Sequence, residues 1–166
     1  MMRLILHSLL LVSLLFSGFL SAHAASRSGK LVRGGEARVV SVVDGDTVVL
    51  DDQRQVRLVG IQAPKLPLGR DYVQKQPFAD QSKAGLKDLV LGKIVRLSWG
   101  GRRQDRHGRA LAHLHLADGT WVQGWLLERG LARVYSFRDN RTRVDAMLAL
   151  ESAAREGREG LWSHDY

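Results

Sequence analysis

Residues 39–61, VVSVVDGDTVVLDDQRQVRLVGI, decide the fold, because three β-prone segments follow one another with a short polar triplet at each junction. Valine recurs in all three segments, and β-branched residues favour strands. The triplets Asp-Gly-Asp and Asp-Asp-Gln are typical of tight turns. The stretch therefore predicts three consecutive strands. On the third strand Arg57 shares a face with Val59 and Ile61, so we expect it to have a partner, since an unpaired buried charge is costly.

The residues that follow predict two further strands and three helices. Apolar residues recur at helical spacing over 78–91, where Gly92 is placed to end the helix, and over 121–129, where Gly130 does the same. Residues 94–99 and 110–116 have strand character, and Asn140 or Thr142 is expected to cap a last helix. The order β-β-β-α-β-β-α-α predicts an α+β fold, a small five-stranded β-barrel with helices packed against it.

The N-terminus has the pattern of a signal peptide over residues 1–24. Arg3 precedes an apolar run to Leu20, and Ala22 and Ala24 are the small residues required before a cleavage site. The alternative, a retained membrane anchor, needs a longer run without polar residues. Residues 25–35 are Gly-rich and basic and predict a flexible leader, and 36–163 form the expected domain. The mature protein is expected to be secreted or periplasmic, monomeric, and without a transmembrane segment.

The chain is strongly basic, with a net charge of +8 and no cysteine. Removing residues 1–24 takes away Arg3 and no acidic residue, which leaves +7 on the domain. Such a surplus favours a polyanionic partner, namely nucleic acid, anionic lipid or an acidic wall polymer. The simpler explanation of the positive charge is that it only keeps the protein soluble. Charge alone does not distinguish this explanation from a polyanionic partner, nor one polyanion from another.

Three segments combine acidic and basic residues in a way that suits phosphate chemistry. They are Asp44-Gly45-Asp46-Thr47, the strand and loop at 56–64, and Asp105-Arg106-His107-Gly108-Arg109. Carboxylates at a tight turn can hold a divalent cation, and guanidinium groups bind phosphate oxygens in a bidentate manner. Taken singly, the first segment is an ordinary hairpin turn and each arginine a surface ion-pair former. Their combination points to a phosphodiester site.

In this order, and together with Gly130-Leu131-Ala132-Arg133-Val134-Tyr135 and Gly160-Leu161-Trp162, the segments resemble the staphylococcal nuclease (thermonuclease) family over about 36–162. The resemblance implies a five-stranded oligonucleotide-binding (OB) fold. It also implies hydrolysis of the phosphodiester bonds of DNA and RNA with calcium as cofactor, and nucleic acid or another polyanion as partner.

The resemblance also assigns roles to individual residues. Asp46 matches the calcium-ligating aspartate, with Asp44 beside it as a turn former and possible second donor. Arg57 and Arg109 match the two phosphate-binding arginines. Three more residues are expected to contact nucleic acid: Arg106 in the basic loop, and Tyr135 and Phe137 as aromatics on which bases stack.

Two positions depart from the family pattern. Gln62 stands where the family has a second aspartate ligand, and Lys65 stands where it has the glutamate proposed as general base. Lysine cannot accept a proton near neutral pH at its ordinary pKa. Lys65 could instead pair with Asp44 and Asp46.

Three hypotheses remain open at this point. One is a nuclease with a modified site, aided by another metal or by a carboxylate such as Asp71 or Asp80. The second is an inactive module that binds nucleic acid or another polyanion in the cell envelope, and the third is a scaffold without ligand. His113 and His115, two residues apart on one strand, could face a common ligand but are expected to be ordinary strand residues.

Overall fold

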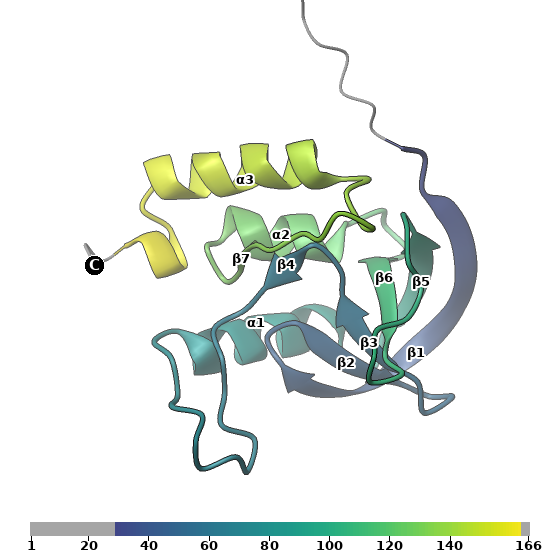
Figure 1. The fold of residues 1–166 in the computed structure, drawn as a ribbon, viewed down its shortest axis with the longest axis horizontal. Coiled ribbons are helices and arrows are strands. Elements are labelled where there is room, and N and C mark those ends of the chain that lie inside the picture. Colours follow the sequence, from purple (N-terminus) through teal and green to yellow (C-terminus); the bar gives the residue numbers. More distant parts are fainter. Residues whose placement is uncertain (1–28, 164–166) are drawn as a thin grey trace, which may run out of the picture.

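The computed structural model describes residues 29–163, so the expected signal peptide and the cleavage site before Ala25 lie outside the described part (Figure 1). The elements are β1 (Val32–Asp44), β2 (Thr47–Leu50), β3 (Gln55–Leu58), β4 (Ile61–Gln62), α1 (Ala79–Val90), β5 (Ile94–Trp99), β6 (Ala110–His115), α2 (Val122–Glu128), β7 (Arg133–Val134), α3 (Val144–Glu156) and a final turn of 3-10 helix, η1 (Gly160–Trp162).

Five strands close into a barrel in the order β1-β2-β3-β6-β5, which confirms the expected five-stranded fold. Closure depends on the long, curved β1, whose first half pairs with β5 and whose second half pairs with β2 (Figure 1). Irregularities of register in both pairings, one of them between Arg33 and Glu36, allow the strand to bend. β3 pairs with β6 in parallel, with Arg57 opposite Leu111, and the other pairings of the barrel are antiparallel.

The expected flexible leader is wrong for its last four residues. Residues 32–35 belong to β1, where Val32 pairs with Trp99 and Arg33 with Ser98. Gly34 lies so close to Trp99 that a Cβ there would fall 2.7 Å from the indole Nε1. Gly34 therefore lets β1 pack closely against the side chain of Trp99 on β5.

The third strand ends earlier than its apolar run predicts. β3 stops at Leu58, and Gly60 turns the chain with a φ of +85°, a conformation that glycine adopts readily. The chain then enters β4, which pairs with β7 in a separate two-stranded sheet. This corner moves Gln62 out of the barrel wall and next to Arg133.

The three helices lie on one side of the barrel, with α2 between α1 and α3 (Figure 1). Their apolar faces complete a core with the barrel interior. Its largest fully buried side chains include Leu50, Leu58, Ile61, Leu86, Leu97, Leu114, Leu126, Leu127 and Met147. No helix within residues 29–163 is long and apolar enough to cross a membrane.

The last helix begins without the expected cap. Arg143 holds the N-cap position of α3 and makes no capping hydrogen bond through its side chain. Asn140 donates through Nδ2 to the Arg102 carbonyl, and the Thr142 hydroxyl donates to the Gly100 carbonyl. Both side chains therefore tie the segment before α3 to the loop after β5.

Candidate functional site

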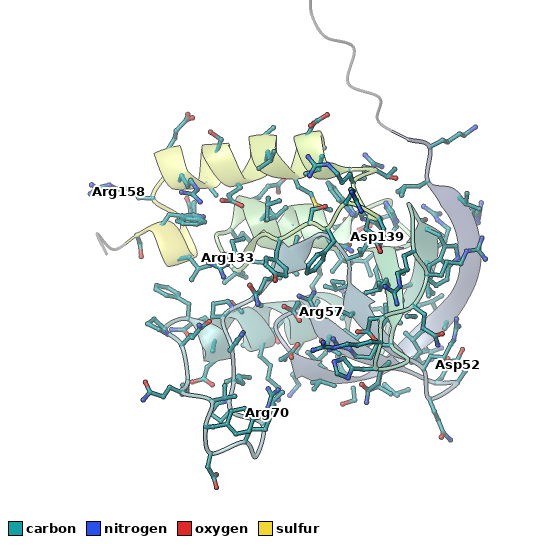
Figure 2. All side chains as sticks on the ribbon, viewed as in Figure 1. Asp52, Arg57, Arg70, Arg133, Asp139 and Arg158 are labelled. Atoms are coloured by element: carbon teal, nitrogen blue, oxygen red, sulfur yellow. The ribbon has the colours of Figure 1, made fainter. Side chains whose placement is uncertain are left out.

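A cleft of about 690 Å³ gathers most of the residues that the sequence singled out. Its walls come from the β3–β4 corner, the loop between β4 and α1, the β5–β6 loop and the segment after β7. The charged and aromatic lining residues are Arg57, Lys65, Arg70, Arg102, Asp105, Arg106, His107, Arg109, Tyr135, Phe137 and Asp139, and Gln62 also lines it. In Figure 2, Arg57 lies near the middle of this face, with Arg70 on the loop below it.

The turn between β1 and β2 places one acidic residue behind this cleft. Asp44 accepts a hydrogen bond from the Asp46 backbone N–H at 3.0 Å, which fixes the turn. Gly45 is required because a Cβ there would fall 2.6 Å from the Cβ of Ala63 and 2.7 Å from that of Ser82. The turn thereby packs against β4 and α1 and directs Asp46 inward.

Asp46 is buried, and its two carboxylate oxygens already have partners. Oδ2 accepts from the Ala63 backbone N–H at 2.7 Å and lies 3.1 Å from Arg57 Nη2, and Oδ1 accepts from the Thr47 hydroxyl at 3.2 Å. Burial raises the pKa of Asp46 to about 6; the Arg57 guanidinium opposes this rise and the Asp44 carboxylate adds to it. Asp46 is therefore a structural anchor for both β4 and Arg57.

Arg57 has the partner that its position on an apolar face predicts. Besides Asp46, its guanidinium donates to the carbonyls of Leu58 at 2.6 Å and Ile61 at 2.8 Å. These contacts span the Gly60 corner and hold the side chain in one orientation. Because a guanidinium has five N–H donors, these contacts leave donors for a ligand.

Arg109 is held by the loop that carries it. Its Nε donates to Asp105 Oδ2 at 2.8 Å, while Asp105 Oδ1 accepts from the backbone N–H groups of His107 and Arg109. Burial would raise the pKa of Asp105, but the hydrogen bonds from Arg109 and the loop backbone outweigh it and lower that pKa. Asp105 thus stays charged and fixes the direction of Arg109.

Gln62 and Lys65 lie at the edge of the cleft, and neither contacts Asp46 through its side chain in any pairing found among residues 29–163. Gln62 Oε1 accepts from Arg133 Nη2 at 2.9 Å, across the β4–β7 pair. The side chain of Lys65 is exposed. The alternative in which Lys65 pairs with Asp44 and Asp46 is wrong, because among residues 29–163 the ion-pair partner of Asp46 is Arg57 and Lys65 forms no ion pair with either aspartate.

Two aromatic side chains line the cleft from the segment that follows β7. Tyr135 is 45% exposed and Phe137 62% exposed, and their rings meet edge to face with centroids 5.0 Å apart. Large aromatic groups left open beside a basic cleft offer faces on which bases can stack. The Tyr135 backbone N–H donates to the Gly60 carbonyl, which ties this wall to the β3–β4 corner.

Basic residues outnumber acidic ones in the cleft by six to two, and both acids are paired. Asp105 is paired with Arg109, and Asp139 lies 3.9 Å from Arg102. The remaining surplus is concentrated where two loops face each other, on Lys65 and Arg70 on one side and Arg106 on the other. The electrostatic character of the cleft suits an extended polyanion.

The amino-acid sequence is similar to those of known nucleases. Residues 55–164 match the family described as staphylococcal nuclease homologue. An uncharacterized endonuclease of Escherichia coli is 36% identical over 130 residues, which is 76% of each chain. The thermonuclease of Staphylococcus hyicus is 27% identical over 130 residues, 76% of this chain and 75% of that one. An endonuclease of Bacillus subtilis is 32% identical over 126 residues, 73% of this chain and 58% of that one.

The chain belongs to the staphylococcal nuclease family. The family hydrolyses phosphodiester bonds of nucleic acid and depends on calcium. Calcium takes six to eight oxygen ligands, several of them carboxylate. Among the oxygen donors at this position, Asp46 accepts from the Ala63 N–H, and the neutral Gln62 amide accepts from Arg133. Within residues 29–163 no group of three or more acidic or histidine side chains is arranged to hold a metal.

Other carboxylates and histidines considered from the sequence lie away from the family site. Asp80 is exposed and paired with Lys75, and Asp71 is exposed; neither lines the cleft. His113 is buried and accepts from Trp121 Nε1 through Nδ1, and His115 is buried on the same strand. Burial lowers the pKa of His113 to about 3 and that of His115 to about 4.

Sequence reasoning did not single out Arg70 and Arg133 at this staphylococcal nuclease site. Arg70 lies in the irregular segment after β4, where no periodicity indicates a direction. Arg133 stood within a family motif, but its contact with Gln62 spans 71 residues and depends on the β4–β7 pair. Two-residue strands carry too little pattern to be recognised in advance.

Proposed function

We propose that this protein binds nucleic acid in the cleft through Arg57 and Arg109, and that its calcium-dependent hydrolysis of phosphodiester bonds is weak. The observation that carries the proposal is the pair of arginines, each held by its own buried or half-buried carboxylate, within a cleft that has a surplus of positive charge. Guanidinium groups fixed in advance bind phosphate oxygens with less loss of side-chain entropy.

The second half of the proposal depends on Gln62 and Lys65. They stand where the family pattern has an aspartate ligand and a glutamate. A lysine ammonium about 5 Å from a calcium ion would repel it by several kcal/mol at an effective dielectric constant of about 20. Loss of a positioned general base typically costs about 10²–10⁴-fold in rate. A module that binds nucleic acid without cleaving it is therefore the second candidate function.

Export is part of the same proposal. The apolar run before Ala22-His23-Ala24 supports removal of residues 1–24 and a secreted or periplasmic location, with a monomer as the acting species. The basic cleft would then meet nucleic acid outside the cytoplasm.

Binding is tested with Arg57→Ala and Arg109→Ala on a labelled single-stranded oligonucleotide. Each variant is expected to bind more weakly, and the slope of log affinity against log salt should flatten by about 0.7 per lost phosphate contact. Lys87→Ala is the matched control, because this exposed lysine on α1 lies outside the cleft and carries the same charge. Arginine variants that fold and bind like the control would overturn the clamp assignment.

Hydrolysis is tested by digesting single-stranded DNA and RNA with the purified mature protein, using a panel of divalent metals and an EDTA control. Little cleavage is expected with calcium. Strong calcium-dependent cleavage by the unmodified protein would refute the second half of the proposal, and Asp71 and Asp80 would then be the first carboxylates to replace.

A further inference from the structure

We propose that Lys65 and Arg133 take over the role of a metal ion at this site. They hold phosphate oxygens of the bound strand in the two hollows that Gln62 lines, so that nucleic acid binds without any divalent cation. This inference rests on the proposed function. It adds that Lys65 and Arg133 supply the positive charge for which the family uses calcium.

Arg133 is brought to this position by strand pairing. It is the direct cross-strand partner of Gln62, and its Nη2 donates to Gln62 Oε1 at 2.9 Å. This contact orients the guanidinium and leaves most of its donors unused. Arg133 is exposed and forms no ion pair within residues 29–163. Its charge is therefore available to an anionic ligand.

Lys65 is positioned by its backbone. Its N–H donates to Gln76 Oε1 at 2.8 Å, and its carbonyl accepts from the Gln76 N–H at 3.0 Å. These two contacts close the base of the loop between β4 and α1, so the lysine begins from a fixed point on the cleft wall. Its ammonium likewise has no acidic partner in the part of the chain that the structure describes.

Gln62 lines both of the hollows in which the two cations lie. Gln62 lines the main cleft together with Lys65, and it also lines a smaller hollow of about 290 Å³ together with Arg133, Pro64 and Trp162. Figure 2 shows Arg133 and Arg57 on the same face, with the β4 segment between them. A strand held by Arg57 that continues past Gln62 would pass from one hollow to the other and meet both cations.

Electrostatics favours this arrangement over a metal. The negative charge of Asp46 is already matched by Arg57 at 3.1 Å, and Gln62 adds no charge. A divalent cation here would meet Lys65 and Arg133 with too few carboxylates to offset the repulsion. Phosphate oxygens have the opposite sign, so a strand that passes through both hollows gains from each cation. Binding should therefore be insensitive to calcium and strongly sensitive to salt.

The test measures affinity for a labelled single-stranded oligonucleotide, in EDTA and in calcium at matched ionic strength. Unmodified protein should bind equally well in both. Lys65→Ala and Arg133→Ala should each weaken binding in EDTA by about fivefold and flatten the salt slope by about 0.7. Lys87→Ala should change neither. Circular dichroism melts of all variants confirm that the substitutions leave the fold intact.

Two patterns of failure are distinguishable. If Arg57→Ala weakens binding while Lys65→Ala and Arg133→Ala match the Lys87→Ala control, this inference is wrong and the proposed function stands. A large loss of affinity in EDTA would also overturn it. If Arg57→Ala and Arg109→Ala match the control as well, the proposed function itself fails.

Discussion

At the scale of single residues, the site is organised by pairs of side chains, in which an ion pair or hydrogen bond from one residue fixes the orientation of the other. Asp46 holds Arg57, Asp105 holds Arg109, and Gln62 is held by Arg133. The first two pairs aim a guanidinium at the cleft. The third places the Arg133 guanidinium beside the neutral Gln62 amide, and the exposed Lys65 follows three residues later. Both residues belong to the proposal that the calcium site is altered.

The double substitution Gln62→Asp with Lys65→Glu is expected to raise both calcium affinity and calcium-dependent hydrolysis. It supplies two carboxylates and removes one cation, which restores the family's charge pattern. Either single substitution should restore less, because ligand and base act as a unit. Calorimetry with calcium and gel-based digestion on all four proteins provide the measurement, and a double variant no better than the unmodified protein would contradict the assignment.

At the scale of elements, the β3–β4 corner connects the barrel to the cleft. Gly60 turns the chain with φ +85°, and its carbonyl accepts from the Tyr135 N–H. The same turn brings the Ile61 carbonyl within reach of Arg57. One glycine therefore sets the relative positions of an arginine and an aromatic wall.

Gly60→Ala is expected to lower the free energy of unfolding by about 1–3 kcal/mol, because an alanine is strained at positive φ. Its Cβ would also fall within 2.7 Å of Met147 Sδ. Gly119→Ala is the matched control, since Gly119 has φ +90° with no atom within 4 Å of a Cβ. Urea denaturation should show a larger loss for Gly60→Ala than for Gly119→Ala, and equal losses would mean that the Met147 contact costs nothing.

At the scale of the whole molecule, the barrel is covered by the three helices on one side (Figure 1). Two histidines of the barrel are buried there. His113 and His115 lie buried between β6 and the helical side, near Arg96 and Arg143. Burial, and then these neighbouring charges, oppose protonation of both rings.

Stability is therefore expected to fall between pH 7 and pH 4. The pKa values of His113 and His115 are about 3 and about 4 in the folded chain and 6.5 when unfolded, so in this range only the unfolded chain takes up their protons. Each such group costs about 1.4 kcal/mol per pH unit. Asp46 acts in the opposite direction between pH 6 and 4, because its pKa is raised to about 6 in the fold.

Two histidines outweigh one aspartate, so the net slope is destabilising in acid. Thermal melts at pH 7, 6 and 5 measure it. In the double variant His113→Gln, His115→Gln, only Asp46 contributes to this pH dependence. Its melting temperature should therefore rise as the pH falls from 6 to 5, whatever its absolute stability. A melting temperature of the unmodified protein that is constant or higher at pH 5 would rule out neutral burial of both histidines.

The mature chain is expected to begin at Ala25, because Ala22 and Ala24 are the small residues before the cleavage site. N-terminal sequencing of the exported product measures this directly. Ala24→Phe should leave a larger, unprocessed precursor, since a bulky side chain is not accepted before the cleaved bond. A product that still begins at Met1 would show that the segment is retained.

Local sequence determined the parts of this protein that depend on neighbours along the chain. The β-branched runs and the turn triplets predicted the second half of β1, β2 and β3, and the run at 94–99 matches β5 to the residue. Helical spacing located α1 and α2 within one or two residues. The ordered motifs were enough to indicate the family and the candidate arginines, because each motif lies within a few residues.

Only the tertiary structure decided which side chains meet. The Asp46–Arg57 pair, the parallel β3–β6 seam and the Gln62–Arg133 contact join residues that are 11 to 71 positions apart, and no local pattern encodes such pairing. Residues 32–35 became strand rather than leader because β5 offered them partners. Long-range contacts depend on closure of the barrel, so the charge of the site follows from sequence whereas its geometry follows from the fold.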